Sequence, residues 1–87
     1  MYRVVWSQVA LDQLADIFVL ADLELQRRMA DAVEALNRHL ELRPFDEGES
    51  RDGSGRVVFV QGGLVVGFSV NEPIQEVRVV GVTQYGR

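Results

Sequence analysis

This chain of 87 residues contains no cysteine and no lysine, and its single histidine is His39. Without cysteine it can form neither a disulfide framework nor a cysteine-ligated zinc site, and one histidine alone does not make a convincing metal site. Nothing in the composition points to an oxidising compartment. We therefore expect a cytoplasmic protein without a metal ion or another cofactor.

The lack of lysine leaves nine arginines against thirteen acidic residues, so the formal net charge is −4. A field of this sign disfavours broad, nonspecific binding to nucleic acid, although a local cluster of arginines stays open as a binding site. Charges also recur every few residues from Asp12 onward, and the N-terminal MYRVVWSQ has no uninterrupted apolar run. We therefore expect neither a signal peptide nor a membrane partner.

The length and the 47% hydrophobic content predict one domain with one core over residues 1–87. A domain of this size buries only about 60% of the surface of its unfolded chain, so its stability should be modest. The second half of the chain holds three apolar runs, RVVFVQ, LVVGFSV and EVRVVGV. Because turn-forming segments separate them at residues 62–63 and 71–73, they predict three consecutive antiparallel strands.

Alternation within the middle run predicts a sheet with two unlike faces, because successive side chains of a strand point to opposite sides. One face of this strand carries Leu64, Val66, Phe68 and Val70. The other face carries Val65, Gly67 and Ser69. We expect helices to cover the first face, which leaves the second for a partner or substrate.

The first half of the chain predicts one strand and two helices. Residues 2–6 are of strand type, whereas apolar residues recur at steps of three and four in residues 8–21 and 23–42. Pro44 ends the second helix. The fold class is therefore α+β, in the order β-α-α-β-β-β, with a two-helix hairpin packed on a small, mainly antiparallel, four-stranded sheet. We expect these side chains to be largely buried: Leu14, Phe18, Met29, Val33, Leu36, Leu40, Phe59, Val66 and Phe68.

Residues 44–55, PFDEGESRDGSG, form the longest stretch without periodicity. Their acidic residues do not have the spacing of an EF-hand, and the glycines lead into a strand and not into a helix N-terminus, where a phosphate would bind. We interpret the stretch as a loop with Phe45 tucked into the core. Within it we expect carboxylates to hold Arg51, with Glu49 as the first candidate.

Arg78 is a candidate binding residue in the last predicted strand. It shares the alternation of Glu76, Val80 and Val82, so it either projects from the open face or flanks the helices, depending on the register. An ion pair with a nearby carboxylate such as Glu76 is the structural alternative to a binding role.

Taken over nearly its full length, the chain resembles the RelE/ParE superfamily of type II toxin–antitoxin toxins, also called plasmid-stabilisation proteins. The resemblance lies in the opening YRVVWS, the helical hairpin, the proline that ends the second helix and the closing three-strand meander. The GESR run at residues 48–51, followed by GRVVFV, is similar to a subgroup with a GESR loop before the second strand. The resemblance implies a toxin that a cognate antitoxin neutralises.

The superfamily implies two toxic activities, ribosome-dependent mRNA cleavage in the RelE-like branch and inhibition of DNA gyrase in the ParE-like branch. The nuclease branch needs basic residues on the open sheet face and a group that moves a proton. Arg56 matches a basic position at the start of the family's second strand. However, Val65 stands where RelE-like nucleases usually carry an arginine, and residues 83–85 read TQY where another basic residue is expected.

Two functional alternatives follow from this departure. A ParE-like toxin, or one with reduced activity, fits better than an mRNA endonuclease. In the nuclease alternative, the catalytic residues would be Arg56, Arg78, Tyr85 and Arg87. Whether the chain is an enzyme therefore stays open.

The expected partner is a cognate antitoxin, with DNA gyrase or the ribosome and its mRNA as alternative cellular targets. A non-toxic interaction module or a homodimer is the third alternative. The partner-binding residues that we expect are Glu49, Arg51, Arg56, Val65 and Arg78.

Overall fold

The computed structural model describes residues 1–50 and 55–85 of the chain. Arg51 and Arg87 therefore lie outside the described residues. The elements follow the predicted order, with a short 3₁₀ helix and a two-residue strand added before the meander. They are β1 (Arg3–Trp6), α1 (Gln8–Val19), α2 (Leu23–Leu42), η1 (Pro44–Asp46), β2 (Glu49–Ser50), β3 (Gly55–Val60), β4 (Leu64–Asn71) and β5 (Glu76–Gln84).

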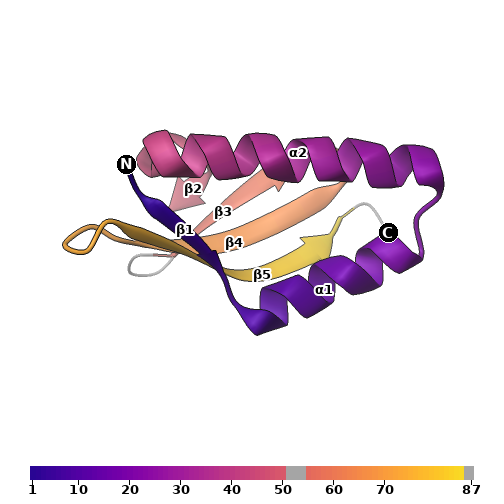
Figure 1. Cartoon of the computed structure of the whole chain (residues 1–87), viewed down its shortest axis with the longest axis horizontal. Helices are drawn as coiled ribbons and strands as arrows, with labels where there is room; N and C mark the ends of the chain where they lie inside the picture. The colour runs from indigo at the N-terminus through magenta and orange to yellow at the C-terminus, as the bar shows by residue number, and fades with distance from the viewer. Residues whose placement is uncertain (51–54, 86–87) are drawn as a thin grey trace.

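The strands form one mixed sheet in the order β1-β5-β4-β3-β2 (Figure 1). β1 runs parallel to β5, and the other neighbours are antiparallel. A parallel neighbour needs a long connection, which the two helices provide. The predicted α+β fold is thus confirmed, and β2 adds a fifth, very short strand at the edge beside β3.

Side-chain caps fix where both helices begin. The Ser7 hydroxyl accepts a hydrogen bond from the Ala10 amide at 3.1 Å, and the Asp22 carboxylate accepts one from the Leu25 amide at 2.8 Å. Each cap satisfies an amide that has no partner within its helix. α2 ends before Pro44, as predicted. None of the described helices is both long and apolar enough to span a membrane.

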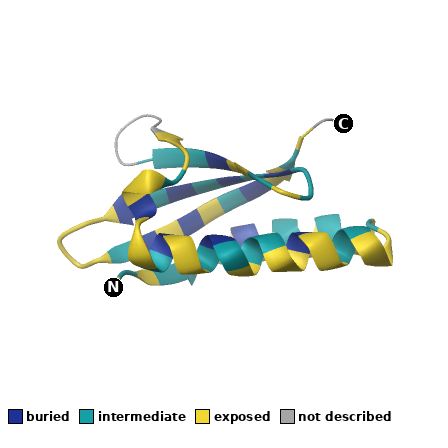
Figure 2. Cartoon of the chain, turned by 90° about the horizontal axis from the view of Figure 1, so that it is seen from above, coloured by how far each residue is buried: buried dark blue, intermediate teal, exposed yellow. Residues whose placement is uncertain are grey.

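The core lies between α2 and the face of the sheet that was predicted to be apolar (Figure 2). The four alternate residues of β4 are buried there: Leu64, Val66, Phe68 and Val70. α2 contributes Met29, Leu36 and Leu40, which are also buried, whereas Leu14, Phe18 and Val33 are half-buried and pack against this cluster. α1 packs mainly against β5 and contributes Ala10.

Two aromatic residues that we expected in the core lie at the surface. Phe59 is 61% exposed, because it pairs with Val65 and shares that residue's face, opposite to the buried Val58. Phe45 is 49% exposed, because η1 turns Pro44 and not Phe45 toward the core. Both predictions were wrong because hydrophobicity alone does not give the face on which a residue lies.

An irregularity in the β4–β5 pairing changes which residues of β5 face the core. Gly67 pairs with Gly81 and Phe68 pairs with Val79, so Val80 is an extra residue on β5. Such a bulge inverts the alternation beyond it. Val82 is therefore buried, whereas Arg78 is exposed on the opposite face. In a regular strand these two residues, four positions apart, would lie on the same face.

Candidate functional site

The sheet face turned away from α2 is the first candidate site, and we call it the open face. The strand register places on it Val57, Phe59, Val65, Gly67, Ser69, Arg78 and Val80. Phe59 is 61% exposed and Val80 is 49% exposed. At the end of β5, the Tyr85 ring meets the Phe59 ring edge to face, with the ring centroids 5.1 Å apart. The open face is thus mainly apolar and carries an accessible aromatic pair.

Two glycines lie opposite each other at the centre of this face, Gly67 on β4 and Gly81 on β5. A Cβ atom at Gly67 would lie 3.8 Å from the nearer Val80 methyl carbon, which is ordinary van der Waals contact. The two glycines therefore place no side chain of their own at the centre of the open face. The sequence indicated this part of the site through the alternation of β4.

The cations near the open face form one group around Glu76. Arg3 donates to the Glu76 carboxylate at 2.7 Å, and Arg78 donates to its other oxygen at 3.3 Å. The hydrogen bond from Arg3, followed by the charges of both arginines, lowers the pKa of Glu76 below its ordinary value. Of the two roles considered for Arg78, the geometry thus shows the ion pair with Glu76. The Arg78 side chain is nevertheless half-exposed.

Arg56 lies on the opposite face of the sheet, because it pairs with the buried Phe68. Its guanidinium donates three hydrogen bonds, to the carbonyl oxygens of Phe45 (3.0 Å), Glu47 (3.0 Å) and Gly48 (3.2 Å). It also lies 6.0 Å from the centre of the Phe45 ring. A planar guanidinium suits several acceptors at fixed positions, so Arg56 fastens the segment after α2 to β3.

The structure therefore does not bring the predicted catalytic residues together. Arg56 and Arg78 lie on opposite faces, and Tyr85 follows Arg78 by seven residues, just beyond the end of β5. At the rise of a strand, seven residues span roughly 20 Å. Arg87 lies outside the described residues.

Of the predicted partner-binding residues, Val65 and Arg78 lie on the open face. Glu49 lies in β2 and pairs with Val57 of β3. Arg51 is outside the described residues, so its pairing with Glu49 stays a prediction. Among the residues that the structure describes, no three His, Asp or Glu side chains are close enough to hold a metal ion.

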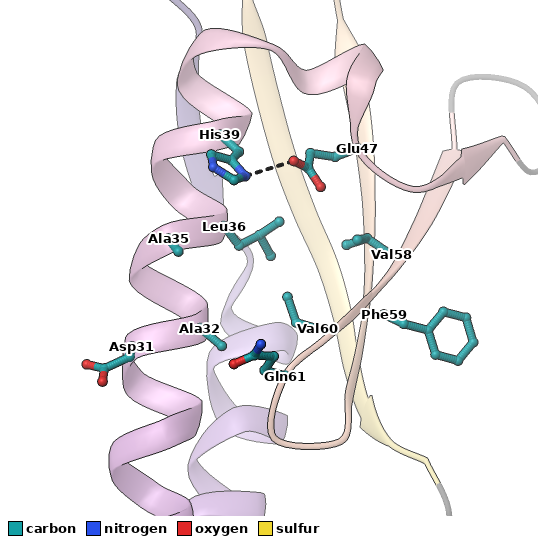
Figure 3. Close-up of a pocket in the computed structure, with 10 residues that line it drawn as sticks. All are labelled: Asp31, Ala32, Ala35, Leu36, His39, Glu47, Val58, Phe59, Val60 and Gln61. Carbon is teal, nitrogen blue, oxygen red and sulfur yellow. Dashed lines mark hydrogen bonds and ion pairs between the residues drawn. The ribbon is translucent and has the colours of Figure 1, made fainter.

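A second candidate site is a groove between α2 and β3, which we call the α2–β3 groove (Figure 3). It has a volume of about 400 Å³. Leu36, Val58 and Val60 point into it, as Figure 3 shows. The other residues that line it include Asp31, Ala32, Ala35, His39, Glu47 and Gln61. Our sequence reasoning missed this groove, although two alanines three residues apart on α2 were the signal available for it.

Polar residues close one end of this groove. His39 Nδ1 lies 2.8 Å from a carboxylate oxygen of Glu47, which joins the last turn of α2 to the loop after it. Gln61 lies toward the other end in Figure 3, whereas the Asp31 side chain points away from β3. The groove is thus an apolar channel with the His39–Glu47 pair at one end and Gln61 toward the other.

Comparison with protein-family models gives no match, and comparison with curated proteins gives none either. Solved structures do match. The chain is similar to one in the intact Escherichia coli RelBE toxin–antitoxin complex, with a TM-score of 0.66, 15% identity and full coverage of both chains. It is similar to the isolated E. coli RelE toxin, with a TM-score of 0.65 and 15% identity over all of this chain and 87% of that one.

An archaeal structure gives the same result. The RelE–RelB complex from Pyrococcus horikoshii has a chain that matches with a TM-score of 0.57 and 17% identity, covering 99% of this chain and 97% of that one. The likeness extends over the whole domain in all three structures, so the resemblance inferred from the order of sequence features is confirmed for the fold. This chain has the fold of the RelE toxins.

Proposed function

We propose that this chain is the toxin component of a type II toxin–antitoxin system, that it acts in the cytoplasm and that a cognate antitoxin neutralises it. The support is the likeness of the whole chain to structures of RelE toxins, two of them in toxin–antitoxin complexes. The sequence adds the opening strand, the helical hairpin and the meander in the family's order. The function rests on this agreement.

The proposed toxin acts by binding a protein and not by cleaving mRNA. The observation that supports this choice is the composition of the open face, where valines, an accessible Phe59 and two glycines occupy the centre. Cleavage of RNA needs several donors around one phosphate, and the loss of one such donor costs on the order of 10²–10³ in rate. Arg56 faces the other way, and Arg78 is bound to Glu76.

Exposed aromatic side chains on an apolar surface are typical of protein–protein contacts, where Tyr and other large side chains carry most of the binding energy. DNA gyrase is the protein target that the ParE-like branch implies, and we propose it ahead of the ribosome and its mRNA. Phe59 and Tyr85 are then the anchors, because they present the largest exposed side chains of this face.

The experiment that tests this function is induced expression of the chain, alone and together with the short reading frame next to its gene. We expect growth arrest in the first case and normal growth in the second. Phe59→Ala should relieve the arrest, because it removes an anchor without touching the core. Leu20→Ala is the matched control: Leu20 is 88% exposed at the turn between the helices, so its loss should leave the arrest unchanged.

Each alternative predicts a different outcome of this experiment. Growth arrest accompanied by an SOS response supports the gyrase-directed branch. Arrest with codon-specific mRNA cleavage supports the nuclease instead. No arrest at any level of soluble, folded protein would identify a non-toxic interaction module, and a homodimer in sedimentation would support its self-association.

A further inference from the structure

The outer edge of β1 is an open strand edge. β1 pairs with β5 alone, and no strand of the part of the chain that the structure describes lies beyond it. Figure 1 shows β1 in front of the rest of the sheet, with α2 on one side of it and α1 on the other. Backbone groups along such an edge form a template for another strand.

Alternate residues of β1 direct their backbone groups to this open side. The amides of Arg3 and Ser7 each donate a hydrogen bond of 2.9 Å to a carbonyl oxygen on the β5 side. Because the direction of the amide alternates along a strand, Val5 also faces β5. The amide and carbonyl groups of Val4 and Trp6 therefore face outward.

From this pattern we infer that β1 pairs with β1 of a second copy of this chain, in antiparallel fashion and around a two-fold axis at Val5. In this register Val4 lies opposite Trp6 of the second copy, and each such pair exchanges two backbone hydrogen bonds. The contact is isologous, because the residues that face outward are also the ones that meet. It joins two five-stranded sheets into one.

The side chains fit the same register. Val5 meets itself at the axis, so no charged residue lies opposite its own copy, and Arg3 lies opposite Ser7. Val4 and Trp6 are half-buried against the core, on the face covered by α2. An aromatic and a β-branched side chain directly opposite each other stabilise an antiparallel pair. The dimer therefore adds an apolar cross-strand contact on each side of the axis.

Helix ends of opposite charge also meet in this arrangement. Tyr2 lies opposite Gln8 of the second copy, and its amide donates to the Glu41 carbonyl in the last turn of α2 at 2.8 Å. The carboxyl end of α2 therefore lies near the amino end of α1 of the second copy. Because the first turn of α1 has no acidic residue, its partial positive charge remains to attract the α2 end. This complementarity favours a second copy over an unrelated strand.

The inference goes beyond the proposed function and does not depend on it. The two-fold axis of an antiparallel pair is perpendicular to the sheet, so the dimer carries both open faces on the same side. A partner with two equivalent sites would then contact both Phe59–Tyr85 pairs at once. The second contact would gain from the effective concentration that the first one sets.

The test begins with the wild-type chain, whose single tryptophan, Trp6, lies at the proposed interface. Sedimentation velocity and Trp6 fluorescence on dilution should both show a monomer–dimer equilibrium. We expect a Kd on the order of 10 µM, because the interface is smaller than that of a stable complex. Amide hydrogen exchange at Val4 and Trp6 should become slower as the protein concentration rises.

Charges placed on the two-fold axis locate the interface. Val5→Lys and Val5→Glu should each raise the Kd of the dimer by about tenfold or more, because like charges then lie directly opposite each other. An equimolar mixture of the two variants should form a heterodimer at least as tight as the wild-type dimer. Val80→Lys is the matched control, since Val80 is an exposed valine of β5 outside the pairing with β1, and it should dimerise as the wild type does. The ¹⁵N spectrum of each variant reports whether it is folded.

A cysteine at the axis tests the same contact without adding charge, and it decides the matter if a charged variant does not fold. The chain has no cysteine, so Val5→Cys introduces a single thiol. A pair without hydrogen bonds between antiparallel strands holds its Cα atoms about 4.5 Å apart, which is within the range of a disulfide. Oxidation at micromolar concentration should therefore give a covalent dimer with Val5→Cys and none with Val80→Cys.

Three results would overturn the inference. The first is a wild-type chain that stays monomeric up to about 500 µM. The second is a dimer that Val80→Lys disrupts and Val5→Lys does not, which would assign self-association to the open face. The third is the absence of a heterodimer when folded Val5→Lys and Val5→Glu are mixed. None of these results bears on toxicity, and a non-toxic chain that dimerises through β1 would contradict only the proposed function.

Discussion

The two faces of the sheet differ although the same strands build them. On the side of α2, β4 presents residues that are almost fully buried, such as Val66 and Phe68. On the open face the alternate positions of the same strand carry Val65 and Gly67, and neighbouring strands leave Phe59 exposed. One strand therefore contributes stability through one set of side chains and an accessible surface through the other.

The arginines show the same division. Arg56 faces the helices, and its guanidinium donates hydrogen bonds to three carbonyl oxygens of the segment after α2. Arg78 faces the open side, where it shares Glu76 with Arg3 and stays half-exposed. The two residues carry the same charge, but the strand register places them on different faces. Arg56 therefore has a structural role, whereas Arg78 is accessible to a partner.

The largest expected effect comes from truncating one phenylalanine on each face of the sheet and comparing the losses of stability. Phe68→Ala should lower the free energy of unfolding by about 3–5 kcal/mol, because it leaves a cavity in the core. Phe59→Ala should lower it by less than about 1 kcal/mol, since it removes only a surface contact with Tyr85. Urea denaturation followed by circular dichroism measures both values. Equal losses of unfolding free energy for the two variants would show that Phe59 is as important to the core as Phe68.

Arg56 gives the next largest effect. Arg56→Ala should lower the free energy of unfolding by about 1–2 kcal/mol, because three carbonyl oxygens lose a charged donor at a partly exposed position. Arg56→Lys keeps the charge but not the planar set of donors, so it should recover less than half of the loss. If Arg56→Ala unfolds like the wild type but loses antitoxin binding, Arg56 is a partner-binding residue after all.

Gln13 of α1 binds the backbone of β5. Its side-chain oxygen accepts a hydrogen bond from the Val82 amide at 2.8 Å, on the side of β5 that faces α1. Gln13→Met keeps a similar volume but leaves this amide without its acceptor, which should cost about 1 kcal/mol. Faster hydrogen exchange at Val82, with unchanged exchange at Val66, would locate the effect. Unchanged exchange at Val82 would mean that the bond adds no protection.

Glu76 should give the smallest effect, and one that depends on pH. Because the two arginines lower its pKa in the folded state, Glu76 adds stability above the pKa of an unfolded glutamate. This contribution disappears as the pH falls through the lowered, folded-state value. The difference in melting temperature between wild type and Glu76→Gln should therefore be present at neutral pH and absent in strong acid. A difference that persists unchanged in strong acid would rule out this ion group as its cause.

Much of the fold was predictable from the sequence because local patterns and burial agree there. The helical spacing gives α2, and the alternation of β4 gives the buried face. The turn between β3 and β4 followed from its glycines: Gly62 has φ +89°, and a Cβ there would come within 2.7 Å of the Met29 side chain.

The site was less predictable, because it depends on pairings between distant residues. The extra residue Val80 inverts the alternation of β5, and no local pattern indicates it. The face of Arg56 is set by its pairing with Phe68, whereas the sequence resemblance gave only its position in the strand. The α2–β3 groove likewise arises where α2 meets β3, and neither element shows it alone.

The most direct measurement of the central claim is a map of mRNA 5′ ends on translating ribosomes after the wild-type chain is induced without antitoxin. Because its open face carries valines in place of basic residues, the chain should arrest growth without producing new, codon-specific mRNA 5′ ends. New ends that appear with the wild type, persist in Phe59→Ala and vanish in Arg78→Ala would contradict the claim. That result would assign the open face to RNA.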